Sequence, residues 1–171
     1  MSRSLKIVVT GPFSAGKTRF IKTISDIDVV STERKITRRI EGITKKTTTV
    51  AMDYGRVTLG EDILHLYGTP GQARFDFMWE ILAPEMDGFV LLVDAADLNT
   101  VDEARELIAM FTAAHAVPYV IAANKQDMEG AASPVKLRRA LDADPDILIM
   151  PCVASRKTSV KQVLAQLAEM I

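Results

Sequence analysis

Short apolar runs alternate with amphipathic stretches along most of this chain, and the spacing predicts alternating strands and helices. Residues 5–10 are rich in β-branched side chains and run into Gly-Pro, which is typical of a strand, and residues 17–24 then show a helical pattern. Residues 87–94 form a nearly continuous apolar run, as expected of a central strand covered on both faces. By the same patterns, further strands are predicted at 47–59, 63–67, 118–123 and 147–152, and helices at 72–82, 100–116, 133–142 and 158–171.

Residues 26–46 interrupt this regularity. They lack a clear period and are crowded with charged side chains, so we predict a long loop there, with a short strand at most. Elsewhere the regular alternation predicts an α/β fold with a mostly parallel sheet and helices on both faces. We expect six strands, one of them an antiparallel edge strand supplied by the hairpin of residues 47–67, and a single domain over residues 1–171. Ligands of such sheets bind beyond the carboxyl ends of the strands, so candidate residues follow the strands directly.

Composition narrows the classes of function. The chain has 171 residues, of which 48% are hydrophobic and 25% charged, and its net charge is −1. This near-neutral balance gives no electrostatic case for nucleic acid as the main partner. The one cysteine, Cys152, lies in an apolar run and is expected to be buried and inert. We see no signal peptide, membrane span, or acceptor for a myristoyl or prenyl group, so we expect a cytoplasmic protein without a lipid anchor of its own.

The segment Gly11 to Thr18 reads G-P-F-S-A-G-K-T and matches the phosphate-binding pattern G-x-x-x-x-G-K-[ST] between a strand and a helix. Backbone N–H groups at such a helix N-terminus bind phosphate, and Gly16 allows close approach. Lys17 is expected to bridge the β- and γ-phosphates, and the hydroxyl of Thr18 to bind Mg²⁺. The N–H groups expected to surround the β-phosphate are those of Phe13, Ser14, Ala15, Gly16, Lys17 and Thr18.

The strand at 118–123 is followed at once by Asn124-Lys125-Gln126-Asp127, the pattern N-K-x-D. The Asp127 carboxylate can accept from guanine N1–H and the exocyclic amine together, whereas adenine offers neither donor, a mismatch that discriminates by up to about 10⁴-fold. Lys125 can lay its stem along the base, and Asn124 can tie this loop to the phosphate loop. After the last strand, the N–H of Ala154, next to Ser155, is the expected donor to guanine O6.

These motifs resemble those of the Ras-like small GTPases, and the resemblance covers nearly the whole chain. It implies the G-domain fold of P-loop NTPases, GTP and GDP as ligands, and Mg²⁺ as cofactor. Thr49 begins T-V-A-M-D-Y, which resembles the switch I stretch T-I-G-V-D-F, and the resemblance implies that Thr49 reaches Mg²⁺ and the γ-phosphate in the GTP state. Gly71-Gln72-Ala73-Arg74-Phe75 resembles the switch II motif G-Q-E-R-F, which implies that Gly71 contacts the γ-phosphate and Gln72 orients the attacking water.

The sequence departs from the family in three places. Gly68 stands where the motif D-x-x-G has its Asp, so another carboxylate has to serve or Mg²⁺ binds more weakly; Asp94 is a candidate. Phe13 is bulkier than the glycine of Ras itself. The stretch between Thr18 and Thr49 is longer than in Ras, and the favoured interpretation is a solvated basic loop. The alternatives are an extra edge strand, as in Arf-like and bacterial polarity GTPases, or an arginine acting in cis, for which the candidates are Arg34, Arg38 and Arg39.

The full pattern resembles a group of bacterial and archaeal Ras-like GTPases whose relatives work with Roadblock- or longin-type proteins, which implies partners of that class. We therefore expect a GTP/GDP switch that hydrolyses GTP slowly, with Gln72 and Lys17 as its catalytic residues. One alternative is a pseudo-GTPase that binds nucleotide and scaffolds partners with little or no turnover. The other is a metabolic P-loop kinase, against which the N-K-x-D pattern argues.

Overall fold

A computed structural model describes residues 2–39, 45–69, 85–114 and 116–171. In this part of the chain, the strands form one seven-stranded sheet with the order β2-β3-β4-β1-β5-β6-β7. The central strands are β1 (Ser4–Thr10), β5 (Gly88–Asp94) and β6 (Tyr119–Asn124), and β7 (Leu148–Pro151) forms one edge. From β4 (Asp62–Gly68) to β7 all neighbouring strands are parallel, whereas β3 pairs with its two neighbours in antiparallel register.

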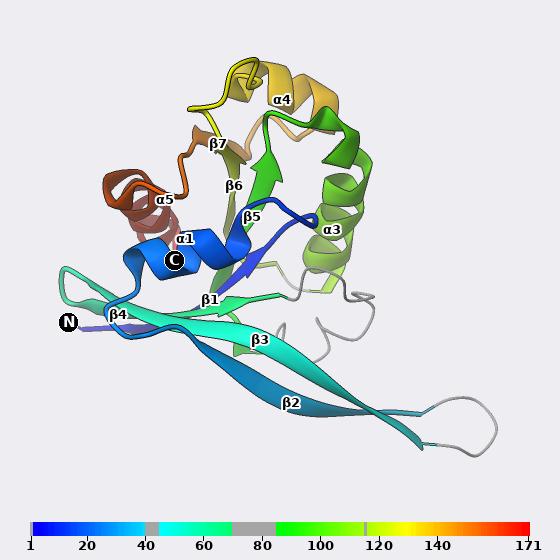
Figure 1. The fold of residues 1–171 in the computed structure, drawn as a ribbon, viewed down its shortest axis with the longest axis vertical. Helices are drawn as coiled ribbons and strands as arrows, with labels where there is room; N and C mark the ends of the chain where they lie inside the picture. Colours follow the sequence, from blue (N-terminus) through cyan, green and yellow to red (C-terminus); the bar gives the residue numbers. More distant parts are fainter. Residues whose placement is uncertain (1, 40–44, 70–84, 115) are drawn as a thin grey trace.

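Helices cover both faces of the sheet, as the sequence predicts (Figure 1). The helices α1 (Lys17–Ile24) and α5 (Lys157–Met170) pack on one face, and α3 (Val101–Ala114), which follows a short 3₁₀ turn at Leu98–Thr100, packs with α4 (Pro134–Leu141) on the other. β1 divides its side chains between the layers: Ile7 and Val9 join the core under α1 and α5, and Val8 joins the core under α3 and α4. This two-layer burial confirms the predicted fold class.

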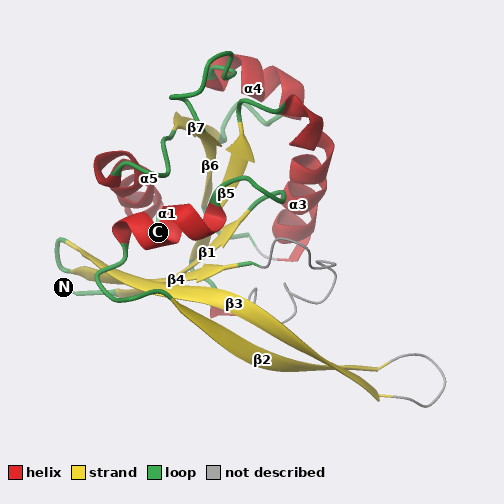
Figure 2. Ribbon diagram, viewed as in Figure 1, coloured by secondary structure: helices red, strands yellow, loops and turns green. Residues whose placement is uncertain are grey.

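The long insertion forms a strand rather than the predicted loop. Residues of β2 (Val30–Arg39) pair with β3 (Lys45–Leu59) over ten successive positions, from Val30 opposite Tyr54 to Arg39 opposite Lys45. Figure 2 shows this pair as a ribbon that extends well beyond the helical layers. The loop prediction was therefore wrong over these residues, and the alternative of an extra edge strand was correct. Cross-strand hydrogen bonds outweigh the weak strand propensity of a charged segment.

None of the helices within the described residues is long and apolar enough to cross a bilayer. The predicted helix at 72–82 lies outside the part of the chain that the structure describes. The other predicted helices are present with ends that differ by a few residues at most. In α4, the Ser133 hydroxyl accepts from the N–H of Lys136 and Pro134 occupies the first turn, so the sequence signals for its start act as expected.

Candidate functional site

The phosphate loop leaves the end of β1 and turns sharply into α1. Its backbone has positive φ angles at Ser14 (64°) and Gly16 (105°), and the loop closes with a hydrogen bond from the N–H of Ala15 to the carbonyl of Pro12 at 3.1 Å. Gly11 lies against the neighbouring strand: a Cβ atom there would be 2.2 Å from the carbonyl oxygen of Leu92. The two glycines of the motif are therefore required by the loop itself, before any ligand is considered.

The side chain of Lys17 folds back over this loop. Its ammonium donates to the carbonyl of Gly11 at 2.5 Å and to that of Pro12 at 3.4 Å, and the residue is only 7% exposed. Burial lowers the pKa of Lys17 to about 8, while the negative charges of Glu103 and Asp53 act in the opposite direction. A positive charge held by carbonyl groups in a buried loop is suited to bind an anion that arrives at the helix N-terminus.

Asn124 joins the phosphate loop to the loop that follows β6. Its amide nitrogen donates to the carbonyl of Ala15 at 2.8 Å, and its amide oxygen accepts from the N–H of Ala154 at 2.9 Å. The side chain is 2% exposed. Three loops that are far apart in the sequence thus meet at one buried amide, and the predicted tie between the N-K-x-D loop and the phosphate loop is present.

The rest of the N-K-x-D loop presents its aspartate to solvent. Lys125 adopts a left-handed backbone (φ 65°), the amide of Gln126 donates to the carbonyls of Ala123 and Ala132, and the N–H of Met128 bonds back to Lys125 at 2.9 Å. Asp127 is exposed at the end of this turn. The turn is therefore fixed by its neighbours, and the Asp127 carboxylate stays available to a ligand.

Asp94, which the sequence offered as a substitute for the carboxylate missing at Gly68, ends β5 and contacts the N-K-x-D loop. One of its carboxylate oxygens accepts from the ammonium of Lys125 at 2.7 Å, and the other accepts from the N–H of Ala96 at 2.9 Å. The interpretation of Asp94 as a magnesium residue is therefore not supported, because the ion pair commits it to the base-side loop.

A different carboxylate meets the phosphate loop. The hydroxyl of Thr18 donates to the carboxylate of Asp53 at 2.7 Å, across from α1 to β3. Sequence reasoning did not select Asp53, although the hairpin register places it directly opposite Gly68. Thr18 and Asp53 together offer hard oxygen atoms, the kind of donor that Mg²⁺ prefers. Among the described residues no three His, Cys, Asp or Glu side chains converge as a metal site.

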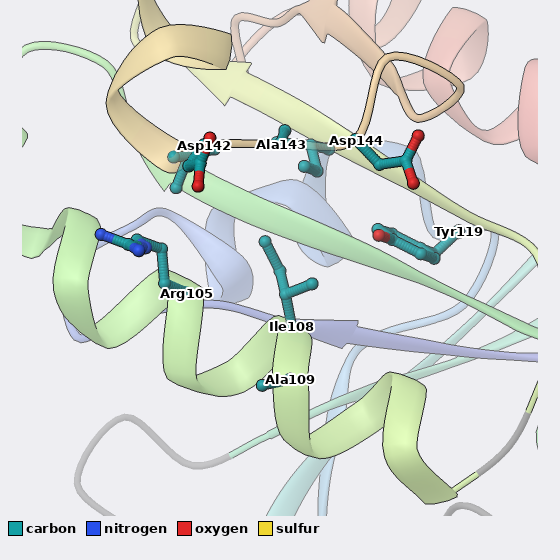
Figure 3. Close-up of a pocket in the computed structure, with 9 residues that line it drawn as sticks. Arg105, Ile108, Ala109, Tyr119, Asp142, Ala143 and Asp144 are labelled. Carbon is teal, nitrogen blue, oxygen red and sulfur yellow. The ribbon is translucent and has the colours of Figure 1, made fainter.

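A hollow of about 260 Å³ lies elsewhere, between α3 and the segment that leads into β7 (Figure 3). Ile108 extends from α3 toward it, and Tyr119 borders it at the start of β6. Tyr119 is at the amino end of β6, whereas the phosphate loop follows the carboxyl end of the parallel strand β1. The hollow is therefore separate from the candidate nucleotide site.

Comparisons with known proteins agree with this geometry. A family model described as a conserved hypothetical ATP-binding protein matches residues 9–171. The uncharacterized protein MJ1339 of Methanocaldococcus jannaschii is 34% identical over 124 residues, which cover 72% of this chain and 71% of that protein. The mutual gliding-motility protein MglA of Myxococcus xanthus is 29% identical over 149 residues, which cover 80% of this chain and 75% of that protein. The chain belongs to the family of that model, which matches most of its length. Together with these relatives, this identifies it as a Ras-like small GTPase.

A solved structure shares the fold of this Ras-like GTPase. The Arl6 BBS3 small GTPase from Trypanosoma brucei with bound nucleotide analogue GppNp matches it with a TM-score of 0.72 and 21% sequence identity, over 97% of this chain and 96% of that chain. The shared fold supports the topology in which the phosphate loop follows β1 and the N-K-x-D loop follows β6.

The structure also shows how the predicted donor to guanine O6 is paired before a nucleotide binds. The N–H of Ala154 was the expected donor to guanine O6, but in the structure it is engaged by the amide oxygen of Asn124. The next residue, Ser155, is exposed, and within the described residues no acceptor meets its N–H. In this state the N–H of Ser155 is an unpaired donor of the loop, and donation from Ala154 to O6 stays a prediction.

Of the three predicted switch-region residues, the structure describes one. Gly71 and Gln72 lie outside the described residues. The backbone of Thr49 lies within β3, paired with Lys35 of β2. Since a strand rises about 3.3 Å per residue, Thr49 is about 13 Å along β3 from Asp53, the residue that contacts Thr18. In this register of β3, the backbone of Thr49 is remote from the phosphate loop.

Proposed function

We propose that this GTPase binds GDP and GTP with Mg²⁺ and switches between two states as it hydrolyses GTP slowly. The observation that carries the proposal is the buried amide of Asn124, which holds the phosphate loop through Ala15 and the base-side loop through Ala154. Two half-sites that are each common in isolation are here parts of one structure. Their separation is therefore fixed for a ligand that has both a phosphate chain and a base.

Guanine is the base that the exposed carboxylate of Asp127 suits. It accepts two hydrogen bonds from guanine N1–H and the exocyclic amine, and the N–H of Ala154 or Ser155 would donate to O6. The matching family model is described as ATP-binding, and adenine would leave the Asp127 carboxylate without donors. We therefore expect the description to be correct for the phosphate site and not for the base.

Competition for a fluorescent GDP analogue tests the choice of base. GDP and GTP should displace it at least about 10³-fold better than ATP. Inosine diphosphate, which lacks only the exocyclic amine, should be weaker than GDP in the wild type and nearly equal to GDP in Asp127→Ala. If ATP displaces the analogue as well as GTP does, guanine specificity is wrong. A wild type that binds none of these nucleotides rejects the whole proposal.

Different residues of the chain are proposed to bind the phosphates and the cation. Phosphate would draw the Lys17 ammonium away from the carbonyls of Gly11 and Pro12, and the N–H groups of the loop would close around it. Thr18 would hold Mg²⁺, whose charge neutralises the phosphate oxygens when it is bound. Thr49 can join Thr18 only if β3 moves along its partner strands, so we expect the change from GDP to GTP to shift the β2–β3 ribbon.

Hydrolysis depends on Gln72, which we propose orients the attacking water. Because catalysis of phosphoryl transfer is mostly positioning, the intrinsic rate should be slow. A single-turnover assay of phosphate release, with Gln72→Ala as the comparison, tests this. The alternative is a pseudo-GTPase, and the departures from the family motifs at Gly68 and Phe13 favour it. It becomes the better interpretation if wild type and Gln72→Ala release phosphate at the same background rate, with partner proteins present.

The class of protein partner follows from the resemblance alone. We propose that Roadblock- or longin-type proteins bind the switch regions and the β2–β3 ribbon, and that the protein acts in the cytoplasm. A pull-down with GDP-loaded and GTP-analogue-loaded protein tests the first point, since a switch requires that one state binds the partner better.

A further inference from the structure

We propose that Asp53 positions Mg²⁺ in this GTPase, in place of the carboxylate that is missing at Gly68. This inference rests on the proposed function, because it concerns the cation that accompanies the nucleotide. Its first support is a direct contact: the hydroxyl of Thr18, the expected Mg²⁺ ligand, donates to Asp53 at 2.7 Å.

The register of the sheet explains how a carboxylate on β3 can replace one that the family has on β4. Asp53 on β3 is the direct antiparallel partner of Gly68 on β4. Residues directly opposite each other in such a pair project from the same face of the sheet. A carboxylate can therefore move from position 68 to position 53 and still face the start of α1.

Packing indicates that the two positions compete for one space. A Cβ atom added to Gly68 would lie 2.8 Å from Cδ1 of Ile21 and 3.3 Å from Cβ of Asp53. Both distances are shorter than ordinary contacts between carbon atoms. The volume that an aspartate at position 68 would need is thus already filled, in part by Asp53 itself. Glycine at position 68 therefore leaves the space that the aspartate at position 53 occupies.

The hydrogen bond also orients the ligand atom. A threonine hydroxyl has one proton and two lone pairs. Because Asp53 accepts the proton, the lone pairs of the Thr18 oxygen are left to face a cation. Asp53 is therefore a positioning residue, which acts through Thr18 and through its negative charge. Its charge also reaches the phosphate-binding ammonium, because it opposes the lowering of the pKa of Lys17. The other candidate, Asp94, is held by Lys125.

The test measures binding of a fluorescent GDP analogue as MgCl₂ is varied, with a parallel measurement in EDTA. GDP is the appropriate nucleotide because it needs no contact from Thr49. In Asp53→Asn, the Mg²⁺ concentration that gives half of the magnesium-dependent gain in affinity should rise about 10–100-fold, the usual cost of losing a group that orients a metal ligand. Binding in EDTA should be unchanged or tighter, since a negative charge near the phosphates has gone.

Asp26→Asn is the matched control. Asp26 also bonds to β3, through the N–H of Thr58 at 2.8 Å, but it has no contact with Thr18. Its magnesium dependence should equal that of the wild type. The double variant Asp53→Gly with Gly68→Asp returns the carboxylate to β4 and removes the Cβ atom of residue 53 that it would meet, and it should recover the magnesium dependence to within a few-fold of the wild type.

The outcomes separate the inference from the proposed function. If the wild type binds GDP but Asp53→Asn needs no more Mg²⁺ than Asp26→Asn, the inference is wrong and the proposed function stands. If the wild type binds GDP neither with Mg²⁺ nor in EDTA, the proposed function fails. Should Asp53→Asn lose binding even in EDTA, the double variant decides: recovery of magnesium-dependent binding supports the role of Asp53, and failure to bind with Mg²⁺ rejects it.

Discussion

Gly16 and Asn124 lie so close that a Cβ atom on the glycine would be 2.5 Å from the amide nitrogen of the asparagine. The glycine of the phosphate loop thus makes room for the residue that fixes the base-side loop, in addition to allowing approach of the phosphate. Its φ angle of 105° is also one that other residues rarely adopt. The two motifs of the site are therefore physically interdependent.

Asn124→Ala should loosen both loops at once. It leaves the carbonyl of Ala15 and the N–H of Ala154 without partners in a buried place, which costs about 2–4 kcal/mol in the free energy of unfolding. Urea unfolding of the nucleotide-free protein measures this cost, and GDP affinity should fall by at least about 10-fold as the spacing of the half-sites is lost.

Gln126→Ala is the control for this prediction, because the side-chain amide of Gln126 donates to the carbonyls of Ala123 and Ala132 and not to the phosphate loop. It should lower stability without changing contacts of the phosphate loop. Equal losses of GDP affinity in the two variants would mean that the tie through Asn124 has no particular importance.

The thiol of Cys152 should be unreactive in the folded protein. The residue is 1% exposed, and burial raises the pKa of the thiol to about 11. At pH 8 only about one thiol in a thousand is then ionised, and a reagent has no access to it. Labelling with a disulfide reagent should follow unfolding, slow further with GDP, and reach one thiol per chain in denaturant. Rapid labelling of the native protein would contradict this.

Local chemistry explains which parts were predictable from sequence. The phosphate loop and Asn124 were found because strand, glycines and polar residues follow one another within a few positions. Asp53 was not, since its importance depends on a partner on another strand: only the hairpin register brings it opposite Gly68. The same holds for β2, whose charged residues are in a strand because β3 pairs with them. The hydrogen bond from the N–H of Ala154 to Asn124 was not predictable either, because it depends on a side chain from another loop.

Removing the charge of Asp94 should disturb the base-side loop and leave the phosphate loop intact. Asp94→Asn keeps an oxygen for the N–H of Ala96 but loses the ion pair with Lys125, whose side chain is about one-third exposed. We expect a loss of stability of about 1 kcal/mol and a few-fold weaker binding of GDP, because Lys125 is no longer held beside the base.

Asp97→Asn provides the comparison for Asp94→Asn. Asp97 accepts from the N–H of Asn99 in the same loop region but is exposed and caps only the short turn before α3. Its replacement should change stability by less than about 0.5 kcal/mol and leave GDP affinity unaltered. If isothermal titration finds both variants equal to the wild type in GDP affinity, the Asp94–Lys125 pair does not support the base.

The stability of the nucleotide-free protein should rise with pH through the titration of Lys17. The pKa of its ammonium is lowered to about 8 in the folded protein from 10.5 in the unfolded chain, so between these values the unfolded chain binds more protons. The cost of burying the charge is present in full below pH 8 and is relieved as the pH rises. Relative to Lys17→Met, which has no such group, the wild type should gain about 1–2 kcal/mol between pH 8 and pH 10 in urea unfolding. Saturating GDP should abolish this gain, because phosphate keeps the ammonium protonated. Parallel pH profiles for the two nucleotide-free proteins would show that Lys17 titrates as an ordinary surface lysine.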